Sequence, residues 1–388
     1  MPASPSTARA INDRLALRFL QEEGPLTAGQ LKDLTGLSRP TVADLVERLT
    51  ASGLVAVVGE AGAQRRGPNA KLYGIVADRA HLAALDVRTE GVRLVVADLL
   101  GKVLAQAALP IEPGEQTGAA VDRAVALLER TAKEAGAERL HTVGVGAPGL
   151  IDPASGELRD SSGLPEWHRR LVAALQERLP ARVLVENETN LAALAEQRDG
   201  ATRDRDTFVL LWLGLGIGAA VVLDRRLRRG ASGGTGEVGF LPVPGTDSLP
   251  SATDCGGGYH SLAGSGAILQ LAVAHGLVEP GEPVERAAEV VRDAVTSGAA
   301  GFLDALADRV VLGVAAVVAV LDPGCVVLAG EVGRAGGDDL ARRVADRLTV
   351  MSPLATQVRA GELGGGAVLR GALLMARGAA QEDVFGAG

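Results

Sequence analysis

One pattern, a strand, a turn and a second strand ending in aspartate, occurs twice in this sequence, at 82–98 and again at 208–224. Each strand is a short run rich in Val, Leu and Ala, which is typical of buried strands. A further strand is predicted at 103–109, and helical stretches follow the two copies near 118–135 and 301–320. A duplicated α/β unit of this kind predicts two similar lobes with a cleft between them.

Length, composition and cysteine content set the class of protein. A chain of 388 residues suggests two or three domains, at about 150 residues each. Hydrophobic residues make up 47% of the chain but aromatic residues only 2%, so Ala, Val and Leu must build the cores. There is no apolar run of about 18 residues and no signal peptide, and Cys255 and Cys325 are too few for a disulfide framework. We expect a cytoplasmic protein without a membrane span.

The first 78 residues differ in charge from the rest of the chain. They carry nine Lys or Arg against eight Asp or Glu, whereas the whole chain has a net charge of −8. The segment opens with Ile11, Leu15 and Phe19 at helical spacing, which predicts one apolar helix face. This helix should stop at Gly24 and Pro25, since both residues interrupt helices.

A second, short helix is predicted to follow. Thr27 and Gln30 have the spacing of a capping box, in which each side chain bonds the other's backbone. We expect Leu31 and Leu34 to face inward. Gly36 then allows the turn that ends the helix.

A third helix and two strands complete the segment. Ser38 is the predicted N-cap, and Pro40 is tolerated because the first turn has no helical partner for its missing N–H. Strands are predicted at 54–58 and 71–76, joined by a basic loop at 59–70. The predicted buried stripe of the third helix is Val42, Leu45, Val46 and Leu49.

This order of elements is typical of a winged helix-turn-helix. We expect the third helix to enter the major groove of DNA at its N-terminal end, with Arg39 as the main base or phosphate contact. The basic loop would be the wing, on the phosphate backbone or in the minor groove. A module that contacts protein in place of DNA is the alternative. The predicted DNA-binding residues are Ser38, Arg39, Pro40, Thr41, Asp44, Arg65, Arg66 and Asn69.

Four motifs in the remainder resemble one known family. They are Gly144-Val145-Gly146-Ala147-Pro148-Gly149-Leu150-Ile151-Asp152, Leu164-Pro165-Glu166-Trp167, Glu186-Asn187-Glu188-Thr189-Asn190 and Gly236-Glu237-Val238-Gly239. In this order and spacing the chain resembles the ROK family of repressors and sugar kinases. The resemblance implies an α/β fold with an N-terminal winged helix-turn-helix (1–78) and a two-lobed actin-like ATPase (ROK kinase-like) domain. The small lobe would be 79–185 and the large lobe 186–365, with a C-terminal helix at about 366–380 returning to the small lobe.

The nucleotide-binding motifs that this resemblance implies are altered. The first phosphate loop of the kinases has the form Asp-x-Gly-Gly-Thr, and here it reads Asp86-Val87-Arg88-Thr89-Glu90. Both glycines are absent, so side chains take space that a triphosphate would need, and Glu90 adds negative charge. The adenine-side motif, which usually ends in two glycines, reads Leu328-Ala329-Gly330-Glu331. We expect no ATP binding and no cofactor.

The catalytic and sugar-binding positions of the family are altered as well. Glu188 stands where the kinases have a catalytic Asp, and its extra methylene would displace the carboxylate. We therefore expect no catalytic residue, with Glu188 as a degenerate base position. Gly163, Phe240 and Leu262 replace polar residues that the resemblance assigns to sugar binding. The predicted effector contacts are Asn187, Glu188, Glu237 and Gly163.

The structural zinc site of the family, a histidine and three cysteines, is not retained. The matching stretch keeps Cys255 and His260, and Phe240 replaces the first ligand. Two ligands do not make a closed tetrahedral zinc site. We expect no metal, and Cys255 to be a small buried residue.

These patterns predict a DNA-binding transcriptional regulator that represses carbohydrate-metabolism genes. Its partners would be operator double-stranded DNA and a sugar or modified sugar, unless effector binding has been lost. Two winged helices related by a twofold axis would read a pseudo-palindrome, in a homodimer or homotetramer. The alternatives are an ATP-dependent sugar kinase of the hexokinase type with an accessory DNA-binding domain, and a scaffold whose winged helix binds protein.

Overall fold

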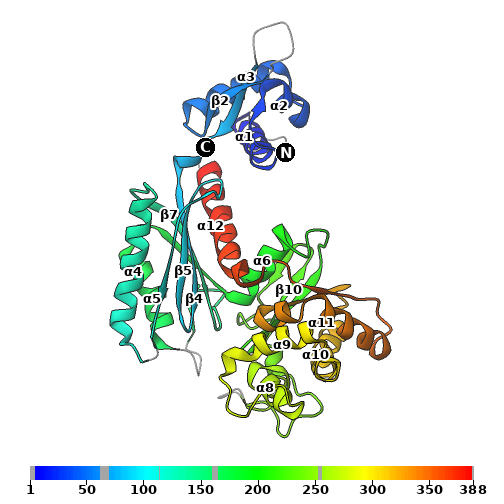
Figure 1. Cartoon of the computed structure of the whole chain (residues 1–388). Helices are drawn as coiled ribbons and strands as arrows, with labels where there is room; N and C mark the ends of the chain where they lie inside the picture. Colours follow the sequence, from blue (N-terminus) through cyan, green and yellow to red (C-terminus); the bar gives the residue numbers. More distant parts are fainter. Residues whose placement is uncertain (1–4, 62–69, 113, 160–164, 252–255, 387–388) are drawn as a thin grey trace.

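The computed structural model of the chain describes residues 5–61, 70–112, 114–159, 165–251 and 256–386. A small N-terminal domain stands above a larger body that consists of two lobes (Figure 1). Within these residues, no helix combines the length and the apolar character needed to cross a membrane.

The N-terminal domain contains three helices and a three-stranded antiparallel sheet in the order β1-β3-β2. Its elements are α1 (Pro5–Glu22), β1 (Leu26–Thr27), α2 (Ala28–Thr35), α3 (Arg39–Ala51), β2 (Val55–Ala61) and β3 (Ala70–Ile75). Strands β2 and β3 pair as the two predicted strands do, from Val55 opposite Ile75 to Ala61 opposite Ala70. The predicted winged helix-turn-helix order of elements is confirmed.

The predicted capping residues of α2 and α3 are confirmed. Thr27 and Gln30 form the reciprocal capping box, and Gly36 ends α2 in the left-handed region at φ 70°. The Ser38 hydroxyl accepts a hydrogen bond from the Thr41 backbone N–H at 3.3 Å. The predicted stripe of α3 is buried at all four positions, Val42, Leu45, Val46 and Leu49.

Two predictions about apolar helix faces are wrong. Ile11 is 55% exposed, because α1 packs on its neighbours through a face rotated away from it, which carries Ala16, Leu17 and Leu20. Leu34 is 42% exposed, because the short helix α2 buries only Leu31 against the core. Apolar spacing therefore predicted the buried face of α3 correctly, but it misplaced one residue each in α1 and α2.

The two lobes contain five-stranded sheets with the same topology. The first sheet has the order β6-β5-β4-β7-β8 and the second β11-β10-β9-β12-β13. In each, three antiparallel strands are followed by two parallel ones. The predicted duplication is confirmed. The strands are β4 (His81–Arg88), β5 (Gly91–Asp98), β6 (Val103–Pro110), β7 (Leu140–Ala147), β8 (Arg182–Asn187), β9 (Phe208–Leu213), β10 (Ile217–Leu223), β11 (Arg226–Arg228), β12 (Cys325–Ala329) and β13 (Gln357–Ala360).

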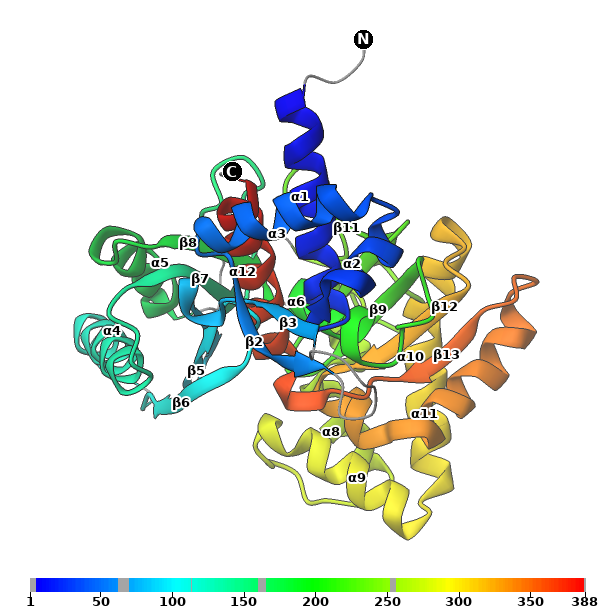
Figure 2. The same cartoon turned by 90° about the horizontal axis from the view of Figure 1, so that it is seen from above.

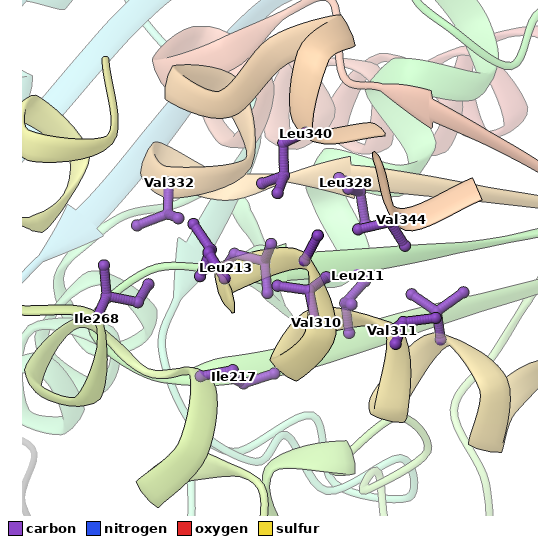
Figure 3. Packing of buried hydrophobic residues seen from close by; sticks show 14 of the residues in the cluster. Leu211, Leu213, Ile217, Ile268, Val310, Val311, Leu328, Val332, Leu340 and Val344 are labelled. Carbon is purple, nitrogen blue, oxygen red and sulfur yellow. The ribbon is translucent and has the colours of Figure 1, made fainter. Parts of the chain in front are cut away.

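Helices cover the outer face of each sheet. Helices α4 (Thr117–Glu134) and α5 (Glu166–Arg178) pack on the first sheet and enclose its core. On the second sheet, apolar side chains of β9, β10 and β12 meet those of the covering helices, as Figure 3 shows. These helices are α7 (His260–Ala263), α8 (Ser265–Ala274), α9 (Ala287–Ser297), α10 (Ala300–Leu321) and α11 (Gly330–Met351).

Two helices form a central layer between the sheets. Helix α6 (Glu188–Asp199) follows the first sheet but packs on the second, and α12 (Ala367–Gly386) follows the second but packs on β4 and β7 (Figure 1). They cross closely at Gly371, where a Cβ would overlap the Leu191 carbonyl. At Gly144 a Cβ would likewise overlap the Ala372 carbonyl. The glycine-rich motif of β7 therefore lets α12 lie directly on the sheet.

The N-terminal domain and the first lobe share one hydrophobic core. Leu17 and Leu20 of α1 belong to the same buried cluster as Leu99 of the first lobe and Ala380 of α12. Backbone contact continues this connection, since the Leu99 N–H donates to the Ala77 carbonyl at 2.9 Å. The two domains are thus joined by packing as well as by the chain, and α12 contacts both.

Candidate DNA-contact surface and inter-lobe site

The N-terminal end of α3 is an exposed surface. In Figures 1 and 2 helices α2 and α3 lie on the side of the N-terminal domain that faces away from the lobes. Ser38, Arg39 and Pro40 are exposed there, and Thr41 is half-buried with its hydroxyl 2.8 Å from that of Ser38. Among the described residues, no carboxylate pairs with Arg39. Its guanidinium is therefore available to an external anion.

The other predicted DNA contact on α3 has an internal partner. Asp44 pairs with Arg48, and the same guanidinium donates to Asp13 of α1 at 2.6 Å. This arrangement ties α3 to α1 and neutralises Asp44 at the surface. The predicted wing residues Arg65, Arg66 and Asn69 and the predicted effector contact Gly163 lie outside the described residues.

An arginine links the two lobes at the altered phosphate loop. Asp86, at the end of β4, is only 1% exposed, and Arg88 Nε donates to its Oδ2 at 2.8 Å. The same guanidinium donates to the Gly365 carbonyl at 2.9 Å and lies 3.8 Å from the Glu331 carboxylate. Burial raises the pKa of Asp86 even with this guanidinium beside it. Arg88 thus joins the first lobe to two segments of the second.

This link was not predicted from the sequence. There, only the absence of the two glycines and the negative charge of Glu90 were considered. Glu90 is 69% exposed and stands 4.0 Å from Arg88 Nη1, so it lies at the rim of the arrangement. The sequence did contain one indication of this link, because Arg88 lies between the acidic residues Asp86 and Glu90. Arg88 stands two residues after Asp86, while Glu331 also belongs to a nucleotide motif. Only the fold shows that one arginine meets both acids.

Asn187 caps helix α6 and fixes the position of Glu188. Its side-chain oxygen accepts from the Thr189 N–H at 2.8 Å and the Asn190 N–H at 3.3 Å. Its amide group donates to the Gly149 carbonyl at 3.1 Å and to Glu188 Oε2 at 3.0 Å. Every hydrogen-bonding group of this amide is therefore occupied within the protein. Asn187 positions Glu188, and it has no free donor for an effector in this state.

Glu188 lies in a strongly acidic environment. Burial raises its pKa from 4.5 to about 8, and the negative charges of Asp86, Glu237 and Glu331 contribute to this shift. At pH 7 the neutral, protonated form is favoured. A protonated carboxyl group donates a hydrogen bond but cannot accept the proton of an attacking hydroxyl.

A second inter-lobe contact involves a glycine-rich loop. The Arg229 side chain donates to Glu186 Oε2 at 2.6 Å, and Asn190 donates to Glu186 Oε1 at 2.9 Å. Gly233 has φ 83°, and a Cβ there would overlap the Ile151 carbonyl of the other lobe. The motif residues of both lobes therefore also hold the lobes together, with Glu237 exposed beside them.

The remnant of the zinc motif is used for packing. His260 Nδ1 accepts from the Ile217 N–H at 3.1 Å, and its ring meets Phe240 edge to face with centroids 5.4 Å apart. Cys255 lies outside the described residues, so its predicted burial is not tested. In the part of the chain that is described, no three potential metal-ligating side chains cluster.

A buried histidine supports the Arg88 segment and was not predicted. His168 of α5 contacts the Arg88 carbonyl through Nε2 at 3.2 Å, while its buried Nδ1 has no hydrogen-bond partner among the residues that the structure describes. Burial lowers its pKa to about 4, so the ring is neutral at pH 7. Its position beside the Leu-Pro-x-Trp motif was the only sequence signal.

Comparison with known proteins gives the family. The ROK family profile matches residues 82–379, and the MarR family profile matches residues 11–67. The xylose repressor of Caldicellulosiruptor bescii is 25% identical over 64% of this chain and 62% of that protein. The DNA-binding transcriptional dual regulator NagC of Escherichia coli K12 is 27% identical over 68% of this chain and 64% of NagC. Each of these two alignments spans less than two thirds of the relative's length.

Solved structures give the same fold. A ROK family transcriptional regulator, a homolog of the E. coli MLC protein, superposes with a TM-score of 0.77 at 19% identity and covers 97% of this chain and 98% of its own. The ROK hexokinase of Thermus thermophilus has a TM-score of 0.62 at 27% identity, covering 78% of this chain and 99% of its own. With the ROK profile matched over most of its length, this chain belongs to the ROK family.

Proposed function

We propose that this protein is a transcriptional regulator that binds operator DNA through its winged helix-turn-helix and represses genes of sugar metabolism. The observation that carries the proposal is the unpaired, exposed Arg39 at the capped N-terminus of α3, in a domain that shares its core with a ROK lobe. The relatives support it, since they are named as a xylose repressor and as the regulator NagC.

We further propose that residues 1–78 act as the DNA-binding unit. In this proposal α3 enters the major groove, with Ser38, Arg39, Pro40 and Thr41 at the bases or phosphates. The segment that contains Arg65, Arg66 and Asn69 is the wing. Asp44 acts indirectly, because its carboxylate is already paired with Arg48.

The ROK domain, by this proposal, senses an effector and has lost kinase activity. The proposed bounds are 79–185 for the small lobe and 186–365 for the large lobe, although β8 of the first sheet extends to Asn187. The effector is held between the lobes near Glu188 and Glu237. Loss of catalysis is supported by the Arg88 guanidinium at the phosphate loop and by the raised pKa of Glu188. An effector acts by favouring one arrangement of the lobes over another, as a homodimer or homotetramer on a pseudo-palindromic operator.

The DNA-binding proposal is tested by gel retardation of the gene's own upstream region. The full chain should bind this DNA selectively, and Arg39→Ala should weaken binding by about tenfold or more, as expected for a lost charged contact. Arg170→Ala is the matched control, because Arg170 is an exposed helical arginine on the first lobe that pairs with Glu166. Equal retardation by Arg39→Ala and the control would contradict the assigned surface.

A sugar kinase of the hexokinase type is the second candidate, favoured by the 27% identity to the Thermus thermophilus hexokinase. It predicts ATP-dependent phosphorylation of glucose or a related hexose by the purified chain. We expect no ATP-dependent thermal shift and no phosphorylated sugar. A measurable turnover that disappears in Glu188→Gln would overturn the assignment of an inactive ROK domain.

A further inference from the structure

A large groove lies between the N-terminal domain and the first lobe, and its lining includes Glu186 and Arg229 of the second inter-lobe contact but not Glu188. It has a volume of about 1220 Å³ and is bordered by α1, α6, α12 and the strand β8. This is ample for a small organic molecule, since ligand pockets are commonly about 300–1,000 Å³. Its position allows one ligand to contact both domains at once.

The groove has an apolar floor. Leu20 comes from α1, Leu184 from β8, Leu194 from α6 and Met375 from α12. Four elements from different parts of the chain thus supply aliphatic side chains to one surface. A ligand with an apolar body would gain by leaving water here.

The charged side chains of the groove are unevenly paired. Arg18 pairs with Glu22, Arg229 with Glu186, and Asp152 with Arg159, which uses most of the lining acids. Arg198 and Arg377 differ from these. Within the described ranges, neither has a carboxylate at ion-pair distance.

Arg198 and Arg377 repel one another. Burial is the main cause of the lowered pKa of Arg377, and the positive charges of Arg198 and Arg370 lower it further, while the negative charge of Asp199, which pairs with Arg370, opposes them. The Arg377 guanidinium makes one hydrogen bond, to the Leu100 carbonyl at 3.3 Å. Two like charges at an apolar surface are stabilised when an anion lies between them, and the planar guanidinium suits oxyanions.

We propose that this groove binds a small organic oxyanion, a phosphate ester or a carboxylate on an apolar body, between Arg198 and Arg377. The ligand contacts α6 and α12 through these arginines and α1 through Leu20. It thereby sets the position of the N-terminal domain relative to the first lobe. Binding itself is independent of the proposed function, whereas any effect on DNA affinity rests on it.

The test uses the full chain and calorimetric titration with three probes of similar size. Phenyl phosphate and benzoate carry the two kinds of oxyanion, and benzyl alcohol is the neutral control. We expect benzyl alcohol to bind at least about tenfold more weakly than the better anion, because charge-assisted hydrogen bonds are lost. The ratio between phenyl phosphate and benzoate identifies the ester or the carboxylate as the ligand class.

Arg198→Ala and Arg377→Ala locate the site. Each substitution should weaken the affinity for the tighter-binding anion by about tenfold. Arg130→Ala, on the exposed face of α4, should leave this affinity unchanged. Arg198 is exposed and pairs with no described carboxylate, so its replacement keeps the fold and remains informative if Arg377→Ala unfolds. Equal binding of benzyl alcohol, unchanged affinity in Arg198→Ala, or no binding of either anion overturns the proposal.

A gel retardation arm separates the two proposals. The better anion should change the affinity of the natural chain for its DNA and have less effect on Arg198→Ala at the same concentration. If the chain retards no DNA but still binds the anion through Arg198, the proposed function fails and the groove site stands. If DNA is bound and the anion is not, the groove proposal fails alone.

Discussion

Strands β4 and β9 occupy equivalent positions in the two sheets, yet the turns that follow them differ in side chains. The first turn carries charged side chains and the second is rich in glycine. Strand β4 ends at Arg88 and is followed by Thr89 and Glu90, whereas β9 is followed by the glycine-rich run 214–218, which continues into β10. Glu331 lies between them, 3.8 Å from Arg88, and a Cβ on Gly214 would be 2.7 Å from its carboxylate. The two lobes thus share the same strand pairing, although the side chains at their turns, which line the inter-lobe site, differ.

The largest loss of stability is expected from replacing Arg88, which stands where the family's phosphate loop has glycine. Arg88→Ala removes the only cation that hydrogen-bonds to the buried Asp86 among the described residues, and should lower the free energy of unfolding by about 3 kcal/mol. Urea denaturation measures this. Arg228→Ala in the second lobe is the exposed control, because it removes an ion pair with Asp224 and a hydrogen bond to the Leu223 carbonyl, and it should cost less than about 0.5 kcal/mol. Equal effects of the two changes would show that burial of Asp86 does not make Arg88 more important than an exposed arginine.

A smaller, pH-dependent effect is expected at Glu188. Its pKa is about 8 in the folded chain against an ordinary 4.5, so the folded state binds more protons between these values. Stability therefore falls as the pH rises from about 4.5 to 8. Glu188→Gln should remove this dependence and stabilise the protein at pH 9 by on the order of 2 kcal/mol. Thermal unfolding across this range measures it, and parallel curves for the two proteins would argue against the raised pKa.

The smallest change in stability is expected at His168, which contacts the Arg88 carbonyl. His168 has a pKa of about 4 in the folded chain against an ordinary 6.5, so the unfolded state binds more protons between these values. Its contribution is complete above about pH 6.5 and is lost as the pH falls toward 4. His168→Phe keeps an aromatic ring and should reduce the loss of unfolding free energy between about pH 6.5 and 4 by about 1 kcal/mol. An unchanged acid limb in chemical denaturation would show that His168 does not titrate there.

The elements of this fold were predictable because their signals are local. The capping pair Thr27 and Gln30, the Ser38 cap and the short apolar runs of the strands each act over a few residues. Inward faces were less predictable, as Ile11 and Leu34 show, because tertiary packing decides which side of a helix is buried.

The inter-lobe site was predictable only in part. Glu188 was found by its motif, but its raised pKa depends on Asp86, Glu237 and Glu331, which three other segments supply. Arg88 was overlooked for the same reason, since its partners Gly365 and Glu331 lie far away in the sequence. A sequence pattern indicates which residues are present, whereas charge and burial at the site depend on how distant segments meet.

The exchange of α6 and α12 between the sheets has a consequence for synthesis of the chain. Because α12 is built from 367–386, the inner face of the first sheet stays uncovered until this helix has been synthesised. Domains of many proteins complete their folding in order from the N-terminus during synthesis. Here the N-terminal domain emerges well before α12, the helix that packs against it. A chain interrupted before 367 therefore carries α3 without the support that orients it.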